Sequence, residues 1–153
     1  MSELRDLYQE VILDHSKRPR NFRCIEDASH SARGHNPLCG DRLSLTLKVE
    51  GDQIADAAFQ GDGCAISKAS ASIMTDAIKG HSVAEARQLF GVMHDMLTGK
   101  GEVDLPPDLP EEFDKLAVFG GVRDYPVRVK CATLPWHTMV AALDGAAQPA
   151  KTE

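Results

Sequence analysis

The strongest constraint on the fold is an alternation of apolar and polar residues between positions 42 and 49. Leucine or valine occupies positions 43, 45, 47 and 49, and charged or hydroxyl side chains occupy the positions between them. Such alternation is typical of a strand with one buried face and one solvated face. A turn signal follows at residues 50–53, and residues 54–60 are predicted to return as the second strand of a hairpin. Residues 24–34 are a candidate for a further strand.

Apolar residues at helical spacing predict four helices around this hairpin, over residues 2–17, 64–79, 82–97 and 132–143. Pro19 ends the first helix, and Gly80 is a natural stop for the second. Ser82 and Glu85 have the spacing of a capping box at the start of the third. The order of helix, strands and then helices predicts an α+β fold, in which helices pack on one face of a small antiparallel sheet.

The stretch before the last predicted helix is harder to assign. Residues 98–110 predict a loop and residues 111–118 a short helix. Residues 122–130 are expected to be extended, because Pro126 biases the residue before it away from helix. Pro135 would then fall in the first turn of the last helix, where proline is tolerated.

Length and charge limit the possible functions. A chain of 153 residues is expected to form one domain over residues 1–144, followed by a disordered tail over residues 145–153. The net charge of −6 argues against nucleic acid and anionic membranes as partners. No apolar run approaches membrane-spanning length, and the polar N-terminus is unlike a signal peptide, so a cytoplasmic location is expected. In that compartment, four cysteines favour metal binding or reactivity over disulfides.

The chemistry centres on residues 36–41, Asn-Pro-Leu-Cys-Gly-Asp. Asn-Pro opens a turn, and Gly40 leaves the backbone between Cys39 and Asp41 free to turn both side chains toward one point. This pair is half of a tetrahedral metal site, and Cys64 and Cys131 are candidates for the other half. Such a set would suit zinc or thiolate-bound iron.

Cys64 and Cys131 are each predicted to stand at the start of a helix, where unpaired N–H groups favour thiolate over thiol. Three thiolates and one aspartate carry a charge of −4, which a divalent metal reduces to −2. Arg128 or Lys130 is therefore expected beside the site, with Arg128 preferred. Because a carboxylate binds zinc less strongly than a thiolate does, this is interpreted as a working site in which Cys39 can leave the metal.

Three cysteine motifs, at residues 36–41, 61–72 and 128–136, together resemble the U-type iron–sulfur cluster assembly proteins. The resemblance covers roughly residues 5–143 and includes the N-terminal residues 13–15 and 19–21. It is closer to the SufU branch, for two reasons. Lys130 stands where the IscU-type scaffolds carry a histidine, and the long stretch at residues 98–121 is similar to an insertion typical of SufU proteins.

The resemblance implies a zinc-dependent sulfurtransferase that accepts persulfide sulfur from a cysteine desulfurase (SufS) and passes it toward a downstream iron–sulfur assembly scaffold. It implies zinc on Cys39, Asp41, Cys64 and Cys131, with Cys39 as the sulfur acceptor. Cys24 has no counterpart in these motifs. The first alternative is a scaffold that assembles a [2Fe–2S] cluster on the same ligands, and the second is a structural zinc module that only binds partners.

Overall fold

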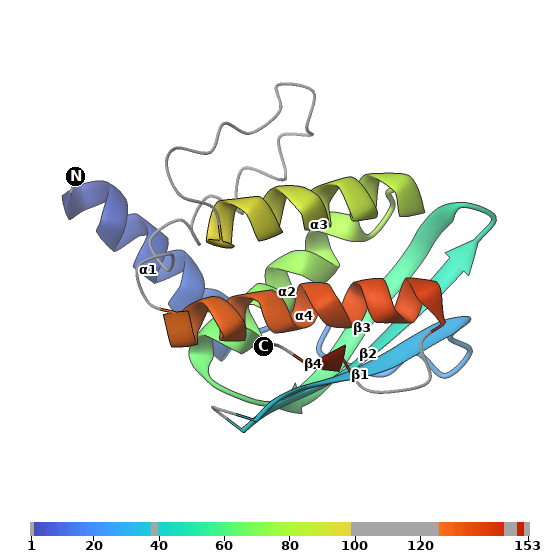
Figure 1. Cartoon of the computed structure of the whole chain (residues 1–153), viewed down its shortest axis with the longest axis horizontal. Coiled ribbons are helices and arrows are strands. Elements are labelled where there is room, and N and C mark those ends of the chain that lie inside the picture. The colour runs from blue at the N-terminus through green and yellow to red at the C-terminus, as the bar shows by residue number, and fades with distance from the viewer. Residues whose placement is uncertain (1, 38–39, 99–125, 146–149, 152–153) are drawn as a thin grey trace.

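The computed structural model describes residues 2–37, 40–98, 126–145 and 150–151. Its elements, in chain order, are α1 (Ser2–Lys17), β1 (His30–Asn36), β2 (Asp41–Glu50), β3 (Gln53–Asp62), α2 (Ala65–Ile78), α3 (Val83–Thr98), α4 (Pro126–Asp144) and β4 (Ala150–Lys151). The strands form one sheet in the order β3-β2-β1-β4. Figure 1 shows the helices gathered on one side of this sheet, which confirms the predicted α+β fold.

The sheet differs from the predicted antiparallel one only at its edge. β1 pairs with β2, and β2 with β3, in antiparallel register, whereas β4 lies parallel to β1. The two residues of β4 therefore depart from the disordered tail expected after residue 144, most of which lies outside the described residues. β1 overlaps the candidate strand at residues 24–34 but starts later, at His30, and ends at Asn36.

The alternation in β2 sets which face of the sheet is covered. Leu45 and Leu47 are fully buried under the helices, while Arg42 and Ser44 are exposed on the opposite face. α4 lies over β1 and β2, and α2 packs on β3 and on α4. α4 approaches β1 closely because Gly34 has no side chain: a Cβ there would lie 2.1 Å from Thr138 Oγ1.

Two predicted helix boundaries can be read directly from hydrogen bonds. At the start of α3, the N–H of Glu85 donates to Ser82 Oγ at 3.0 Å and the N–H of Ser82 donates to Glu85 Oε1 at 3.1 Å, so the capping box is confirmed. α2 ends as predicted, with Gly80 following it at a φ of 86°. The short helix predicted at residues 111–118 and the surrounding loop lie outside the described residues.

α4 corrects the predicted start of the last helix. It begins at Pro126 rather than near residue 132, so residues 126–130 are helical and not extended. Proline suits the first helical position, because its missing N–H would have no intrahelical partner there and its φ is already helical. Pro135 consequently falls inside the helix and not in its first turn. Next to it, Ser70 Oγ of α2 donates to the carbonyl of Ala132 at 2.6 Å and accepts from Trp136 Nε1 at 3.1 Å.

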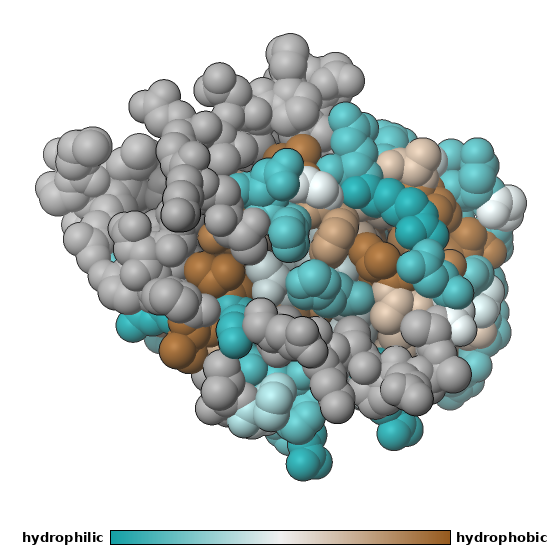
Figure 2. Space-filling model, in the orientation of Figure 1, coloured by the Kyte–Doolittle hydropathy of each residue, from teal (hydrophilic) through white to brown (hydrophobic). Residues whose placement is uncertain are grey.

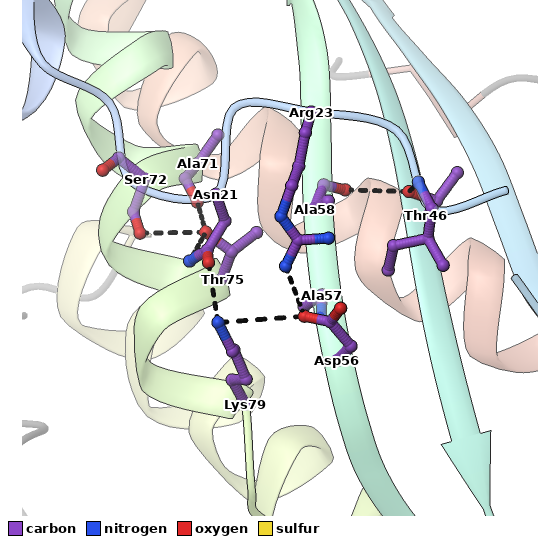
Figure 3. Close-up of polar contacts among 11 residues, drawn as sticks. Asn21, Arg23, Thr46, Asp56, Ala57, Ala58, Ala71, Ser72, Thr75 and Lys79 are labelled. Carbon is purple, nitrogen blue, oxygen red and sulfur yellow. Dashed lines mark hydrogen bonds and ion pairs between the residues drawn. The ribbon is translucent and has the colours of Figure 1, made fainter.

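The chain between α1 and β1 runs beside β3 and then over the outer face of the sheet. Figure 3 shows how polar contacts fasten it there. Arg23 donates to Asp56 on β3 at 2.6 Å. Asn21 Nδ2 donates to Thr75 Oγ1 of α2 at 3.2 Å, and Asn21 Oδ1 accepts from Lys79 Nζ, directly after α2, at 2.9 Å. This segment is therefore held by side chains from both the sheet and a helix.

Polar and apolar residues are interspersed over the α3 and α4 side of the molecule, as Figure 2 shows. Scattered apolar side chains of this kind are ordinary on a protein surface. Within the described ranges, none of the helices combines the length and apolar character that crossing a membrane would require.

Candidate metal centre

Three of the four predicted ligands meet where the sheet, α2 and α4 come together. Asp41 is the first residue of β2, Cys64 is the N-cap of α2, and Cys131 lies well inside α4. One ligand atom from each lies within 4.8 Å of the other two. The fourth predicted ligand, Cys39, lies outside the described residues.

The spacing of these atoms fits a tetrahedral zinc ion after a small contraction. With zinc–sulfur bonds of about 2.3 Å and zinc–oxygen bonds of about 2.0 Å, two sulfur ligands lie about 3.8 Å apart, and a sulfur and an oxygen lie about 3.5 Å apart. Cys64 Sγ lies 3.9 Å from Asp41 Oδ2, close to this value. Two thiols and a carboxylate are also donors that zinc accepts, so the site passes this test of geometry and chemistry.

Asp41 is held by a hydrogen bond that leaves one of its oxygens for a metal. The side chain is 1% exposed, and its Oδ1 accepts from the backbone N–H of Cys64 at 2.9 Å. Its Oδ2 accepts from the Cys64 thiol at 3.9 Å. Gly63 makes this arrangement possible, because a Cβ there would lie 2.9 Å from Asp41 Oδ1.

The two described cysteines of the site are supported in different ways. Cys64 caps α2 as predicted, and its sulfur accepts from the backbone N–H of Ser67 at 3.4 Å. The same prediction is wrong for Cys131, because α4 starts five residues before it. Instead, Cys131 is 2% exposed, and its sulfur accepts from Asn36 Nδ2 at 3.6 Å. A side-chain donor therefore takes the place of the helix terminus.

Arg128 and Lys130 lie on α4, shortly before Cys131, and not on extended chain as predicted. Arg128 is exposed and lies three residues before Cys131, close to one helical turn away, while Lys130 is half-buried. The role of Arg128 beside a bound metal stays a prediction.

Three other residues with side chains that could bind a metal, His15, His137 and Cys24, lie outside the ligand group. His15 is buried and hydrogen-bonded through Nδ1 to Ser72 Oγ at 2.7 Å. His137 lies between α3 and α4 against Phe90, where burial, followed by the nearby His94, lowers its pKa below the ordinary value. Cys24 is an exposed free thiol.

Two residues that shape the site, Asn36 and Gly63, are not among the predicted site residues. Asn36 is predicted only to open a turn, and no role at the site is predicted for Gly63. The sequence position of Asn36 carries a signal, because residues two apart on a strand lie on the same face of the sheet. Asn36 follows Ala32 and Gly34 at this spacing, and both face the helices from β1. That signal requires the strand to be assigned through residue 36, whereas the candidate strand stopped at residue 34.

Comparison with known proteins gives a consistent relationship. Residues 7–132 match the model of the NifU-like N terminal domain. The zinc-dependent sulfurtransferase SufU of Bacillus subtilis is 44% identical over 138 residues, which are 90% of each chain. The iron–sulfur cluster assembly scaffold protein IscU of Streptococcus pyogenes is 39% identical over 94% of this chain and 86% of its own.

A solved structure supports the relationship indicated by these two relatives. The crystal structure of an iron–sulfur cluster assembly scaffold protein for the SUF system, from Fervidobacterium islandicum, superposes with a TM-score of 0.79 at 36% identity, covering 88% of this chain and 94% of its own. The family match spans most of the chain and includes Asp41, Cys64 and Cys131. The chain belongs to the NifU-like N-terminal domain family.

Proposed function

We propose that this protein is a zinc-dependent sulfurtransferase that accepts persulfide sulfur from a SufS-type cysteine desulfurase for iron–sulfur cluster biogenesis. The observation that carries the proposal is the convergence of Asp41, Cys64 and Cys131 from three separate elements. The 44% identity to SufU of Bacillus subtilis supports the choice of zinc and of sulfur transfer.

In this proposal Cys39 completes the ligand set and is the sulfur acceptor. Zinc, when bound, would favour the deprotonated thiols without taking part in redox chemistry. Cys64 and Cys131 are fixed to helices and Asp41 to the start of a strand, so these residues keep the site in shape. Cys39 belongs to the short connection between β1 and β2, which makes it the ligand best placed to exchange.

The transfer itself is a thiol exchange in which atoms and charge balance. The Cys39 thiolate attacks the outer sulfur of the donor's cysteine persulfide, and a new bond forms between Cys39 Sγ and that sulfur. The sulfur–sulfur bond of the donor breaks, and its cysteine leaves as a thiolate. No external oxidant or reductant is required, because the sulfane sulfur keeps its oxidation state. The persulfide on Cys39 then passes to a downstream assembly scaffold.

The test is alanine production by the cognate desulfurase acting on cysteine, with iron absent, in the presence and absence of the zinc-loaded chain. We expect strong stimulation by the wild type and none by Cys39→Ser. Cys24→Ser is the matched control, because Cys24 is an exposed thiol outside the ligand group. Equal stimulation by Cys39→Ser and the wild type would refute the choice of acceptor and favour a structural zinc module.

The second candidate function is a scaffold for a [2Fe–2S] cluster on the same four ligands, with the cluster as cargo. The similarity to IscU of Streptococcus pyogenes supports it. Lys130 counts against it, since the IscU-type scaffolds that the sequence resembles carry a histidine there. Absence of stimulation, together with cluster assembly once iron is supplied, would establish the scaffold and reject the sulfurtransferase.

A further inference from the structure

Asn36 connects the turn that carries Cys39 to the helix that carries Cys131. It is the last residue of β1 and is completely buried. Its backbone carbonyl accepts from the N–H of Gly40 at 2.8 Å and so closes the turn. Its side-chain Nδ2 donates to Cys131 Sγ at 3.6 Å. Burying an amide is costly unless it forms hydrogen bonds, so these contacts give Asn36 one defined position.

The hydrogen bond makes the surroundings of the two described thiols unequal. Cys131 is 2% exposed and receives a side-chain donor from another element of the fold. Cys64 is half-buried and receives a backbone N–H from its own helix. An N–H donor stabilises a thiolate and reduces its reactivity as a nucleophile, and hydrogen bonds to metal ligands fix their orientation. Cys131 is therefore both shielded and held.

The nearest described residues on either side of position 39, Pro37 and Gly40, lie at the surface. Gly40 is exposed, adopts a φ of 74°, and has no atoms within 4 Å of the place where a Cβ would stand. Pro37 is also exposed. In the described part of this connection, Asn36 is therefore buried and hydrogen-bonded, whereas Pro37 and Gly40 are exposed.

We propose that Asn36 is a positioning residue that keeps Cys131 on the metal and thereby leaves Cys39 as the cysteine that exchanges. This inference rests on the proposed function, because it assumes a metal held by these cysteines. It assigns the choice of reactive thiol to one buried amide: Asn36 fixes the base of the turn with its backbone and Cys131 with its side chain.

The test is a competition between the cysteines of the zinc-loaded full chain for limiting iodoacetamide, with the modified peptides quantified by mass spectrometry. In the wild type we expect Cys39 to be alkylated well before Cys131. In Asn36→Asp, a carboxylate oxygen replaces the N–H donor at constant size. The ratio of Cys131 to Cys39 alkylation should then rise by about tenfold or more, and zinc affinity measured by chelator competition should fall by about 10- to 100-fold.

Ser70→Ala is the control for a general loosening of α4. It removes two hydrogen bonds to this helix, at Ala132 and Trp136, without removing the donor to the Cys131 thiol. We expect it to lower the free energy of unfolding and to leave the order of alkylation unchanged. If Asn36→Asp does not fold, Asn36→Ala removes the same donor without adding a charge, and its folding is checked by circular dichroism.

An unchanged order of alkylation in a folded Asn36 variant would overturn the inference, as would a wild type in which Cys131 reacts before Cys39. Neither measurement uses a desulfurase. A failure of this inference is therefore distinguishable from a failure of the proposed sulfur transfer, which would appear as absent stimulation of alanine production.

Discussion

Two polar clusters of this molecule have opposite designs. The first fastens the segment after α1 and consists of complementary pairs, such as Arg23 with Asp56 (Figure 3). The second is the ligand group of Asp41, Cys64 and Cys131. Here one carboxylate and two thiol groups, each of which carries a negative charge when deprotonated, lie close together. In the first cluster each charge meets its opposite near the surface. In the second, the carboxylate and one thiol are almost completely buried.

The difference separates a structural role from a chemical one. The paired cluster needs no additional group, because its hydrogen bonds and ion pairs satisfy one another. The ligand group has hydrogen bonds that orient its atoms, from the N–H of Cys64 and from Asn36, yet Asp41 Oδ2 and both sulfurs still converge. Converging anionic atoms in a buried position favour a cation.

The largest effect is expected when a ligand is removed. Cys64→Ala should lower zinc affinity by more than about 100-fold, because losing a supporting hydrogen bond alone costs about 10- to 100-fold at metal sites. Chelator competition measures this affinity. Arg23→Ala, in the paired cluster, should leave it unchanged, and an equal loss in the two variants would remove the distinction between the clusters.

Gly34→Ala should have the next largest effect, a loss of stability, because the added methyl group pushes α4 away from β1. A Cβ at position 34 would lie 2.1 Å from Thr138 Oγ1 and 3.1 Å from a methyl carbon of Leu134. Overpacking of this kind costs about 1–3 kcal/mol in the free energy of unfolding, measured by urea denaturation. Gly91→Ala is the matched control, since its Cβ position is open and a helical alanine is favoured over glycine by about 0.5–1 kcal/mol.

Gly63→Ala should affect the ligand group more than the fold. A Cβ there would lie 2.9 Å from Asp41 Oδ1 and disturb the hydrogen bond from the N–H of Cys64. We expect zinc affinity to fall by about tenfold, at the lower end of the effects of supporting hydrogen bonds, with a small change in urea midpoint. A large drop in the urea midpoint without loss of zinc affinity would show that Gly63 serves the fold instead.

The smallest effect is expected from the ion pair of the first cluster. Arg23 and Asp56 are partly solvated, so Arg23→Ala should cost no more than about 1 kcal/mol in the free energy of unfolding. The hydrogen bond from Arg23 is the largest cause that lowers the pKa of Asp56 below its ordinary value of 3.8.

A lowered pKa in the folded state fixes the direction of the pH effect. The pair stabilises the protein at pH values above the unfolded pKa of Asp56, and this stabilisation is lost as the pH falls through the lower, folded pKa. Thermal unfolding of wild type and Arg23→Ala should therefore differ at neutral pH, and the difference should shrink as the pH falls below about 4 and vanish once the pH lies below the folded pKa of Asp56. A difference that persists in strong acid would show that the ion pair is not its source.

Much of the fold follows from local sequence signals. The alternation at residues 42–49 predicts β2, and the capping box of Ser82 and Glu85 predicts the start of α3, because both depend on neighbours in the sequence. The start of α4 was mispredicted because Pro126 was considered only for its effect on the preceding residue. At the first position of a helix, the same proline is favourable.

The residues of the candidate site could be predicted from the sequence, but the hydrogen bonds that hold them could not all be predicted. The residue types of the cysteine motifs and the resemblance they carry predict Asp41, Cys64 and Cys131 as ligands, and these three side chains converge in the structure. The support of Cys131 by Asn36 could not be predicted, because it joins residues 95 positions apart through the packing of α4 on β1. Hydrogen bonds between distant elements depend on tertiary structure, and the misplaced helix start obscured this one further.

The most direct test of the central claim is the location of the transferred sulfur. The zinc-loaded wild type is incubated with its desulfurase and cysteine, free thiols are blocked, and the cysteine peptides are analysed by mass spectrometry. We expect one added sulfur on the peptide that contains Cys39, and none on those of Cys24, Cys64 or Cys131. Added sulfur on Cys24, or on no cysteine while the desulfurase turns over, would contradict it.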